Sequence, residues 1–185
     1  MKRHLLSSFL ARIPSKRSTL AALTLLGSAC TLQACYADEL RGRVVAVIDG
    51  DTLTVLDAQK EQHRIRLAEI DAPEKKQPFG RAAKESLAGM CFQKEAVVQV
   101  LGRDRYGRTI GHVICHGVNT SEEQVRRGMA WIYPSHTGVI NFKLHALLDE
   151  ARAAKRGLWR DRNPVEPWKF RAWDDVKARA TMNPW

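Results

Sequence analysis

The sequence predicts an α+β fold in which five short antiparallel strands form a small barrel and three helices cover one side of it. Five apolar runs, several of which alternate with polar residues, lie between residues 40 and 115 and are separated by turn-forming residues. Three other segments place apolar side chains at helical spacing. A curled sheet with helices against it would bury both faces of the strands.

The predicted strands fall into two groups along the chain. Residues 40–48, 52–56 and 63–70 form the first group, with turns at "DGD" and "DAQKEQ" between them. Residues 96–101 and 108–115 form the second group, joined by the polar connection "GRDRYGR". If the first three strands form a meander, the first turn and the end of the third strand meet at the same edge of the sheet.

Helices are predicted over residues 81–90, 119–129 and 141–157. The second has a capping box, in which Thr120 is the N-cap and Glu123 lies three residues on, and Gly128 ends it. The third carries one apolar stripe, which core packing explains, and it ends at Gly157.

Residues 1–37 have the features of an export signal and are predicted to be a signal peptide. They carry half of the net charge of +10, contain no acid and include the apolar run 20–32. That run is shorter than the about 20 apolar residues that a bilayer span needs. Two outcomes stay open. Cleavage after Ala37 would release a soluble protein, whereas the lipobox-like "LQAC" would leave Cys35 as a lipidated N-terminus.

The predicted domain follows at residues 38–160. Residues 161–185 form a polar extension with prolines and tryptophans, which either packs as an arm or hangs loose. Export to the periplasm or the medium implies an oxidising compartment, so Cys91 and Cys115 either pair or remain two buried thiols. The sequence contains no zinc-finger spacing and no His-Glu-x-x-His motif, and its histidines show no paired metal spacing.

Four carboxylates lie in the two segments expected at the shared sheet edge. Asp49 and Asp51 belong to the first turn, and Asp71 and Glu74 follow the third strand. Clustered carboxylates repel one another and raise each other's pKa, whereas a hard cation removes that penalty. Oxygen ligands favour calcium or magnesium over zinc. Asp51 and Asp71 are therefore the expected direct ligands, and the alternative is two unrelated acidic turns.

Arginines supply the second half of a candidate catalytic site. Strand alternation puts Arg66 on the face opposite Ile65, and Arg108 closes an arginine-rich connection. Guanidinium groups fit phosphate oxygens with two parallel hydrogen bonds. A cation, a spare carboxylate and two arginines are what phosphodiester hydrolysis requires. A membrane-binding protein is disfavoured, because the chain after the signal is only mildly basic and has no long basic amphipathic helix.

In this order, "VIDGDT", "RIRLAEIDAPE" and "DRYGR" resemble the motifs of the thermonuclease family, whose best-known member is staphylococcal nuclease. "VRRGMAWIY" and "ARAAKRGLW" fit the same family, so the resemblance extends from about residue 40 to residue 160. The chain looks like an exported bacterial member. The resemblance implies a five-stranded OB-type barrel with three helices.

The resemblance also implies a calcium site. The family's two metal-binding aspartates match Asp51 and Asp71, and Asp49 matches a nearby acid that is not a principal ligand. A family threonine that offers only its backbone carbonyl to the metal falls on Ala72, so this change should be harmless. Ca²⁺ is the cofactor expected on this basis.

Catalytic and phosphate-binding residues are implied in the same way. Glu74 matches the glutamate that activates or positions the attacking water. Arg66 and Arg108 match the two phosphate-binding arginines, and Tyr106 matches the tyrosine that hydrogen-bonds a nucleotide phosphate. The family's base-stacking aromatic pair has no positional match. Trp131 and Tyr133 lie close by in the sequence, and core packing is the favoured role of Trp131.

The function expected from these residues is calcium-dependent hydrolysis of phosphodiester bonds in DNA and RNA, with internal cutting and 3′-phosphate products. DNA and RNA would be the partners, as substrates of a monomer. The alternative is a non-catalytic OB-type module that binds nucleic acid or protein. Because the acids and both arginines are all present, the enzyme is favoured.

Overall fold

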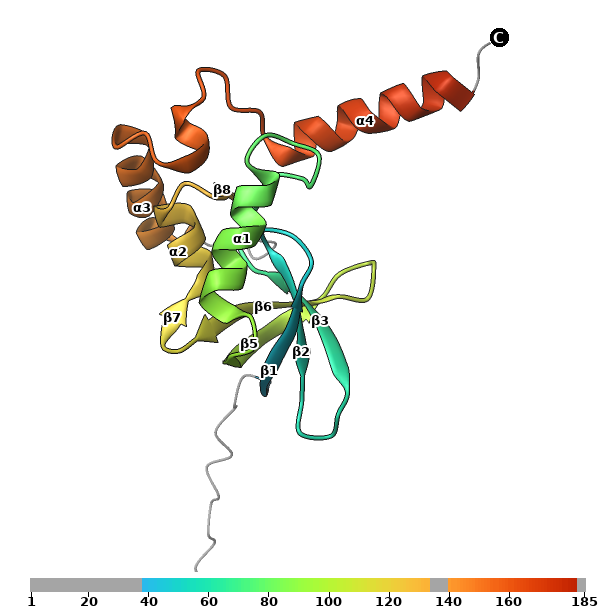
Figure 1. The fold of residues 1–185 in the computed structure, drawn as a ribbon, viewed down its shortest axis with the longest axis vertical. Helices are drawn as coiled ribbons and strands as arrows, with labels where there is room; N and C mark the ends of the chain where they lie inside the picture. The colour runs from blue at the N-terminus through green and yellow to red at the C-terminus, as the bar shows by residue number, and fades with distance from the viewer. Residues whose placement is uncertain (1–37, 134–139, 183–185) are drawn as a thin grey trace, which may run out of the picture. The chain divides into compact units, whose positions relative to one another are not determined.

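A computed structural model describes residues 38–133 and 140–182 (Figure 1). The predicted signal peptide, with Cys35, lies outside the described residues. Five strands form a closed barrel: β1 (Glu39–Val47), β2 (Thr52–Leu56), β3 (Gln62–Leu67), β5 (Glu95–Arg103) and β6 (Thr109–Cys115). A short β7 (Val118–Asn119) pairs with β6. The α+β class and the five-stranded barrel are thereby confirmed.

One parallel seam closes the barrel. The strands follow the order β3-β2-β1-β5-β6 with antiparallel neighbours, and β3 then pairs with β6 in parallel. In this seam Ile65 lies opposite Thr109, and Arg66 lies opposite Ile110. Strand direction cannot alternate all the way around a ring of five, so the barrel predicted as antiparallel needs one parallel pair.

Apolar side chains fill the barrel interior. Ile65 and Leu67 of β3 are buried, whereas Arg66 between them lies on the other face of the strand, as the two-residue alternation predicts. The other strands contribute fully buried residues in the same way: Val44, Leu53, Val55, Val98 and Val113.

The third predicted run, residues 63–70, is wrong in its last part, because it breaks into two strands. A turn at Ala68 and Glu69 interrupts it, and Glu69 adopts a left-handed conformation with φ of 64°. Beyond the turn, β4 (Ile70–Asp71) leaves the barrel sheet and pairs with β8 (Trp131–Ile132). The break redirects the chain, so that the residues after β3 run toward the helices.

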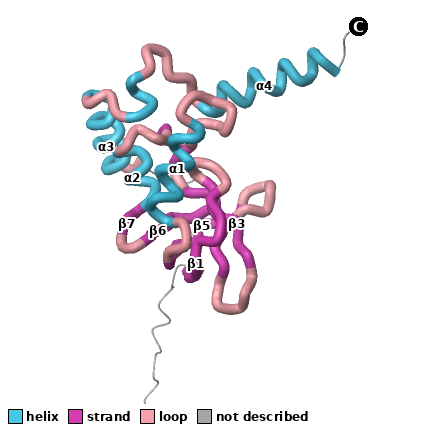
Figure 2. Tube along the Cα trace, in the orientation of Figure 1, coloured by secondary structure: helices cyan, strands magenta, loops and turns pink. Residues whose placement is uncertain are grey.

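Three helices gather on one side of the barrel: α1 (Gly80–Cys91), α2 (Thr120–Arg126) and α3 (Phe142–Ala153) (Figures 1 and 2). Each buries an apolar side against the core, and Leu87, Val125 and Leu144 are among the largest fully buried side chains. A disulfide joins Cys91 at the end of α1 to Cys115 at the end of β6, which resolves the two open alternatives for these cysteines.

The predicted N-cap of α2 and the predicted end of α3 differ from the structure. Asn119 rather than Thr120 is the N-cap of α2, because its side chain accepts from the backbone N–H groups of Ser121 and Glu122. The Thr120 hydroxyl instead donates to a carbonyl of β6. Helix α3 ends at Ala153 rather than Gly157, and Gly157 opens a 3-10 turn, η1 (Gly157–Arg160).

The extension forms a fourth helix, α4 (Pro167–Met182), so the expected count of three α-helices is corrected to four within the described residues. Trp168 of α4 packs against Trp131 and Tyr133, with ring centroids 6.1 and 5.7 Å apart. Trp131 also packs edge-on against Trp159 at 4.5 Å, in agreement with its favoured packing role.

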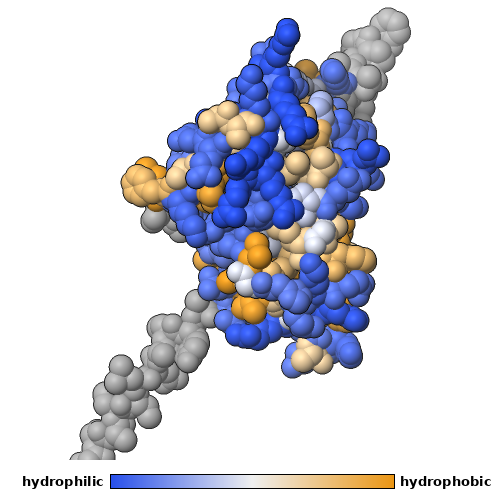
Figure 3. Space-filling model, turned by 60° about the vertical axis from the view of Figure 1, so that its left-hand side comes forward, coloured by the Kyte–Doolittle hydropathy of each residue, from blue (hydrophilic) through white to orange (hydrophobic). Residues whose placement is uncertain are grey.

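The surface is largely hydrophilic on the face that Figure 3 shows, where apolar residues appear as separate small patches. Among the helices of the described chain, none combines the length and the apolar character that crossing a membrane would take.

Candidate active site

The turn between β1 and β2 contains Asp49-Gly50-Asp51 and forms one wall of the candidate site. The Asp49 carboxylate accepts a hydrogen bond from the Asp51 backbone N–H at 3.1 Å, which stabilises the turn. A Cβ at Gly50 would lie 2.6 Å from the Cβ atoms of both Ala72 and Ala83, so a larger residue does not fit. The glycine therefore lets the turn pack between the end of β4 and α1.

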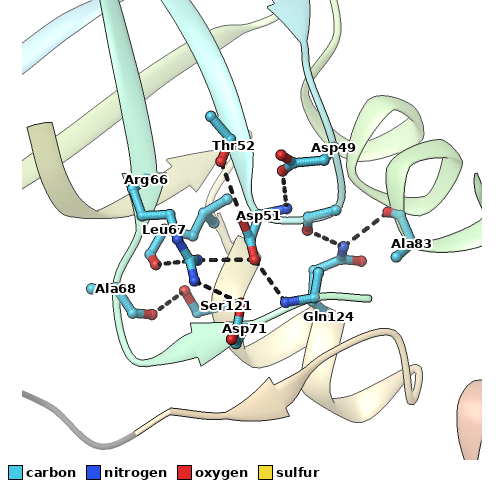
Figure 4. A network of polar contacts seen from close by, with 12 residues as sticks. Asp49, Asp51, Thr52, Arg66, Leu67, Ala68, Asp71, Ala83, Ser121 and Gln124 are labelled. Carbon is cyan, nitrogen blue, oxygen red and sulfur yellow. Dashed lines mark hydrogen bonds and ion pairs between the residues drawn. The ribbon is translucent and has the colours of Figure 1, made fainter. Parts of the chain in front are cut away.

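Two polar side chains of α2 hold the backbone around this turn (Figure 4). Buried Gln124 donates from Nε2 to the carbonyl oxygens of Gly50 at 2.6 Å and Ala83 at 3.0 Å. Ser121 donates to the Ala68 carbonyl at 3.0 Å. Neither residue was predicted from the sequence. The signal that would have found them is a polar residue on the buried side of a short helix.

The two predicted metal ligands and one predicted arginine form a compact cluster (Figure 4). Arg66 contacts Asp51 Oδ2 through Nη1 and Asp71 Oδ1 through Nη2, both at 3.0 Å. The Ala72 backbone N–H donates to Asp51 Oδ2 at 2.7 Å, and the Thr52 hydroxyl donates to Asp51 Oδ1 at 3.0 Å. Acids 20 residues apart along the chain thus converge at the sheet edge where sequence analysis expected them.

Negative charge in this cluster is incompletely compensated. Burial raises the pKa of the Asp51 carboxyl to about 7, while the Arg66 guanidinium acts in the opposite direction and Asp49 and Asp71 raise it further. Asp51 and Asp71 are buried side by side and share the Arg66 guanidinium, so a cation placed beside them would be attracted by both carboxylates. The surrounding donors are carboxylate and backbone oxygens, a set that suits a hard divalent cation. The residues present therefore fit calcium.

Another group of potential ligands lies elsewhere in the described chain. Asp57, Glu61 and His63, at the β2–β3 hairpin, each offer one ligand atom, and these atoms lie within 4.8 Å of one another. Contacts of the hairpin itself explain this group, because the Asp57 carboxylate accepts the Glu61 N–H at 2.8 Å and lies 2.7 Å from His63 Nε2. The group is separate from the groove that holds Asp51 and Asp71.

Glu74 follows β4, and its backbone is held by the turn that leads into α1. The Gln77 side-chain oxygen accepts the Glu74 N–H at 3.1 Å, and the Glu74 carbonyl accepts the Gln77 N–H at 2.8 Å. A Cβ at Gly80 would clash with the Glu74 carbonyl oxygen, so glycine is required where α1 begins. The Glu74 side chain is 36% exposed and lines the groove.

The connection between β5 and β6 presents Tyr106 and Arg108. Asp104 accepts the backbone N–H groups of Tyr106 at 2.9 Å and Arg108 at 3.0 Å, and it also accepts Arg108 Nε at 2.6 Å. The guanidinium groups of Arg105 and Arg108 lie 5.0 and 5.7 Å from the centroid of the Tyr106 ring. Asp104 therefore orients Arg108, a role that sequence analysis missed, although an aspartate at the start of a tight turn is its usual signal.

All seven residues predicted for the site line one open groove of about 1150 Å³. They are Asp51, Arg66, Asp71, Ala72, Glu74, Tyr106 and Arg108. Three more arginines, Arg64, Arg103 and Arg105, also line the groove. A groove with acids at one point and arginines around them suits an anionic ligand that is bound through a cation.

A further arginine enters the groove from α4. Arg171 contacts Asp71 Oδ2 through Nη2 at 2.8 Å and Glu74 Oε1 through Nη1 at 2.5 Å. The hydrogen bond to Asp71 has the largest effect on the pKa of Arg171. Together with the hydrogen bond to Glu74, it raises that pKa above its usual value. The sequence does not predict this contact, because one arginine in a polar extension carries no local signal of a distant partner.

A family model described as "Staphylococcal nuclease homologue" matches residues 64–161. The matched segment includes Arg66, Asp71, Glu74 and Arg108, whereas Asp51 lies ahead of it.

Curated relatives extend the similarity beyond that segment. A protein named "Micrococcal nuclease" from Shigella flexneri is 39% identical over 167 residues, which cover 84% of this chain and 95% of the relative. An "Uncharacterized endonuclease" from Escherichia coli O157:H7 is 45% identical over 134 residues, or 72% of this chain and 86% of the relative. "Protein ParB" from Escherichia coli is 44% identical over 142 residues, or 72% and 80%.

Proposed function

Because the chain belongs to the staphylococcal nuclease family, we propose that it is a calcium-dependent nuclease that hydrolyses phosphodiester bonds in DNA and RNA. Family membership and the names of the relatives support nuclease activity at this coarse level. Calcium dependence, internal cutting and 3′-phosphate products are the finer parts of the proposal, and they come from the resemblance of the motifs. The observation that carries the proposal is the convergence of Asp51, Asp71 and Arg66 in one groove.

Asp51, Asp71 and the backbone carbonyl of Ala72 would hold the calcium ion. When bound, a divalent cation there would polarise the phosphate and stabilise the negative charge of the transition state. The protein's part is to keep both carboxylates in place, which the bonds from Arg66, Thr52 and Ala72 to Asp51 support. Such preorganised charge lowers the barrier, because no reorientation is needed as the reaction proceeds.

Arg66 and Arg108 would bind the phosphate from two sides of the groove. Arg66 is fixed by the two aspartates, and Arg108 is oriented by Asp104. Guanidinium groups in these positions would stabilise the extra negative charge as phosphorus becomes five-coordinate. Tyr106, at the rim beside Arg108, would donate a hydrogen bond to a phosphate of the bound nucleotide.

Glu74 would act on the attacking water. In this step the water oxygen bonds to phosphorus, its proton passes to the Glu74 carboxylate, and the bond from phosphorus to the 5′-oxygen breaks. The leaving oxygen takes up a proton and becomes a 5′-hydroxyl, and the phosphate stays on the 3′-oxygen. The 36% exposure of Glu74 and its place in the groove support this role, since a general base needs access to water.

We also propose that the chain is exported and processed at its N-terminal segment. Residues 1–37 would direct export, and the nuclease would act as a monomer in the periplasm or the medium. It would be soluble after cleavage at Ala37 or anchored through a lipidated Cys35. Residues 38–160 would form the nuclease domain and residues 161–185 its extension. Intact-mass measurement of the exported protein distinguishes the two forms, because lipidation adds mass to Cys35.

Cleavage of supercoiled plasmid by the purified protein tests the enzymatic proposal. Nicking is expected in calcium and not in excess chelator. Glu74→Gln is expected to retain nucleic-acid binding and to cut about 10²–10⁴-fold more slowly, because this is the usual contribution of a general base to the rate. Binding without calcium-dependent nicking by the wild type would overturn the proposal in favour of the non-catalytic module. Near-normal turnover by Glu74→Gln would remove Glu74 from the mechanism.

A further inference from the structure

One cationic side chain occupies the carboxylates that the proposed function assigns to metal binding and catalysis. Arg171 of α4 contacts both Asp71 and Glu74. Building on the proposed function, we propose that Arg171 is a tethered competitor of the metal ion, which occupies these carboxylates until calcium displaces it. The docked C-terminal helix then holds the nuclease in a state of low calcium affinity.

The contact geometry leaves Asp71 no free oxygen. Arg171 Nη2 lies 2.8 Å from Asp71 Oδ2, and Nη1 lies 3.2 Å from Oδ1. Arg66 Nη2 also contacts Oδ1, at 3.0 Å. A calcium ion needs a carboxylate oxygen at about 2.3–2.6 Å, which is closer than the guanidinium nitrogens lie. The ion and the Arg171 guanidinium, both cations, therefore compete for the oxygens of Asp71.

The charges of the cluster also favour competition between Arg171 and the ion. Arg171 places one positive charge in contact with Asp71 and Glu74, two of the carboxylates that would attract the ion. With Arg171 in place, part of the attraction for that ion is already satisfied. Arg171 thus replaces the ion electrostatically as well as sterically.

The contacts that hold α4 are weak enough for Arg171 to leave the carboxylates when calcium binds. Helix α4 is held near its start by Trp168, which packs against Trp131 and Tyr133. Farther along, Trp173 is 54% exposed and borders an apolar pocket of about 310 Å³ at the α4 side of the domain. The Arg171 side chain itself is 43% exposed, so water can replace its contacts when calcium arrives.

Competition of this kind lowers the apparent affinity in a predictable way. If the Arg171-free state is populated in about one molecule in ten, the apparent Kd for calcium is about tenfold larger than the intrinsic one. Removing the guanidinium should therefore tighten calcium binding by about tenfold. A residue that merely stabilised the site would have the opposite effect when removed.

Isothermal titration of the full chain with calcium chloride, without nucleic acid, tests the proposal. Three variants are compared with the wild type: Arg171→Gln, Lys177→Gln and Asp71→Asn. Lys177→Gln is the matched control, because Lys177 is exposed on the same helix and its substitution removes one positive charge away from the carboxylates. Thermal unfolding of each variant in chelator confirms that it is folded.

Arg171→Gln is expected to bind calcium about tenfold more tightly than the wild type, and Lys177→Gln within about twofold of it. Equal or weaker calcium binding by Arg171→Gln would overturn the competitor proposal. Equal tightening by both variants would also overturn it, because general charge would then explain the effect. A failure of the proposed function would give a different result in the calcium titrations. In that case the wild type and Asp71→Asn would bind calcium alike, or not at all, whatever residue 171 is.

Discussion

The inner and outer halves of the candidate site are built differently. The inner half, Asp51, Arg66 and Asp71, lies on the barrel strands and at their edge, with side chains 8%, 15% and 2% exposed. The outer half, Glu74, Tyr106 and Arg108, lies on connections. Tyr106 is 70% exposed and the Arg108 side chain is 27% exposed. The half that must hold an ion is thus part of the core, and the half that must meet a long flexible substrate is on the surface.

The supports of the two halves differ as well. Asp51 is bonded to Arg66 of β3, to Thr52 of β2 and to the backbone of Ala72, so its position depends on the whole fold. Arg108 depends on Asp104 of its own connection. Substitutions in the inner half should therefore affect folding and activity together, whereas those in the outer half should affect activity alone.

Arg66→Gln should have the largest effect. It leaves buried Asp51 without its guanidinium partner and Asp71 with Arg171 alone, so the free energy of unfolding in chelator should fall by about 3–5 kcal/mol. Nuclease activity should fall below detection. Urea unfolding measures the stability change. Exposed Arg64 on the same strand provides the control, since Arg64→Gln should change the unfolding free energy by less than about 0.5 kcal/mol. Equal stability of the two variants would contradict the distinction between the halves.

Arg108→Lys should separate activity from stability. The lysine keeps the charge but loses the planar fork, so kcat/KM should fall by about 10²–10³-fold, or about 2.7–4 kcal/mol of barrier. The free energy of unfolding should stay within about 0.5 kcal/mol of the wild type. Steady-state cleavage of a short oligonucleotide and urea unfolding measure the two effects. A stability loss like that of Arg66→Gln would show that the connection is part of the core after all.

Calcium binding should depend on pH through Asp51. Because burial raises its pKa from 3.8 to about 7, the metal-free protein carries a proton there below pH 7 that calcium must displace. Affinity should fall about tenfold per pH unit below that point. The same proton contributes stability to the metal-free fold that is fully present below pH 3.8 and lost as the pH rises through 7. Calorimetric titrations between pH 5.5 and 8 measure the affinity, and a flat profile would contradict the prediction.

Tyr106→Phe should have the smallest effect. It removes one hydroxyl from an exposed side chain and keeps the ring that contacts Arg105 and Arg108. Loss of one hydrogen bond to a substrate phosphate should raise KM about fivefold, or about 1 kcal/mol, with kcat nearly unchanged. Initial-rate kinetics over a range of oligonucleotide concentrations separates the two constants. A fall in kcat with unchanged KM would instead place the hydroxyl at the reacting phosphate.

Local patterns predicted much of the fold. The second strand, residues 52–56, agrees with β2 to the residue, because alternation and flanking turns define it locally. The break at Glu69 and the end of α3 at Ala153 were missed, since tertiary contacts decide them. The glycine expected to stop α3 serves instead in a close approach, because a Cβ at Gly157 would clash with the Gly128 carbonyl oxygen.

In the candidate site, too, some residues are predictable from local patterns and others depend on distant segments. Convergence of Asp51 and Asp71 was predictable, because a three-strand meander brings the first turn and the end of the third strand to one edge. Gln124 and Arg171 were not, since each acquires its role from segments more than 40 residues away in the sequence. Residues that carry chemistry tend to stand in motifs, whereas residues that position or restrain them can lie anywhere that the fold brings close.

The parallel seam between β3 and β6 constrains how this chain can change in length. Arg66 lies within the seam, and Arg108 directly precedes it, so backbone hydrogen bonds fix the positions from which the two side chains extend. Inserting one residue in β3 ahead of Arg66 would turn its side chain to the opposite face and separate the pair. Residues added at the hairpin around residue 59 or at the turn around residue 117 would leave the seam intact. Changes of length in those two turns should therefore be better tolerated than changes within β3 or β6.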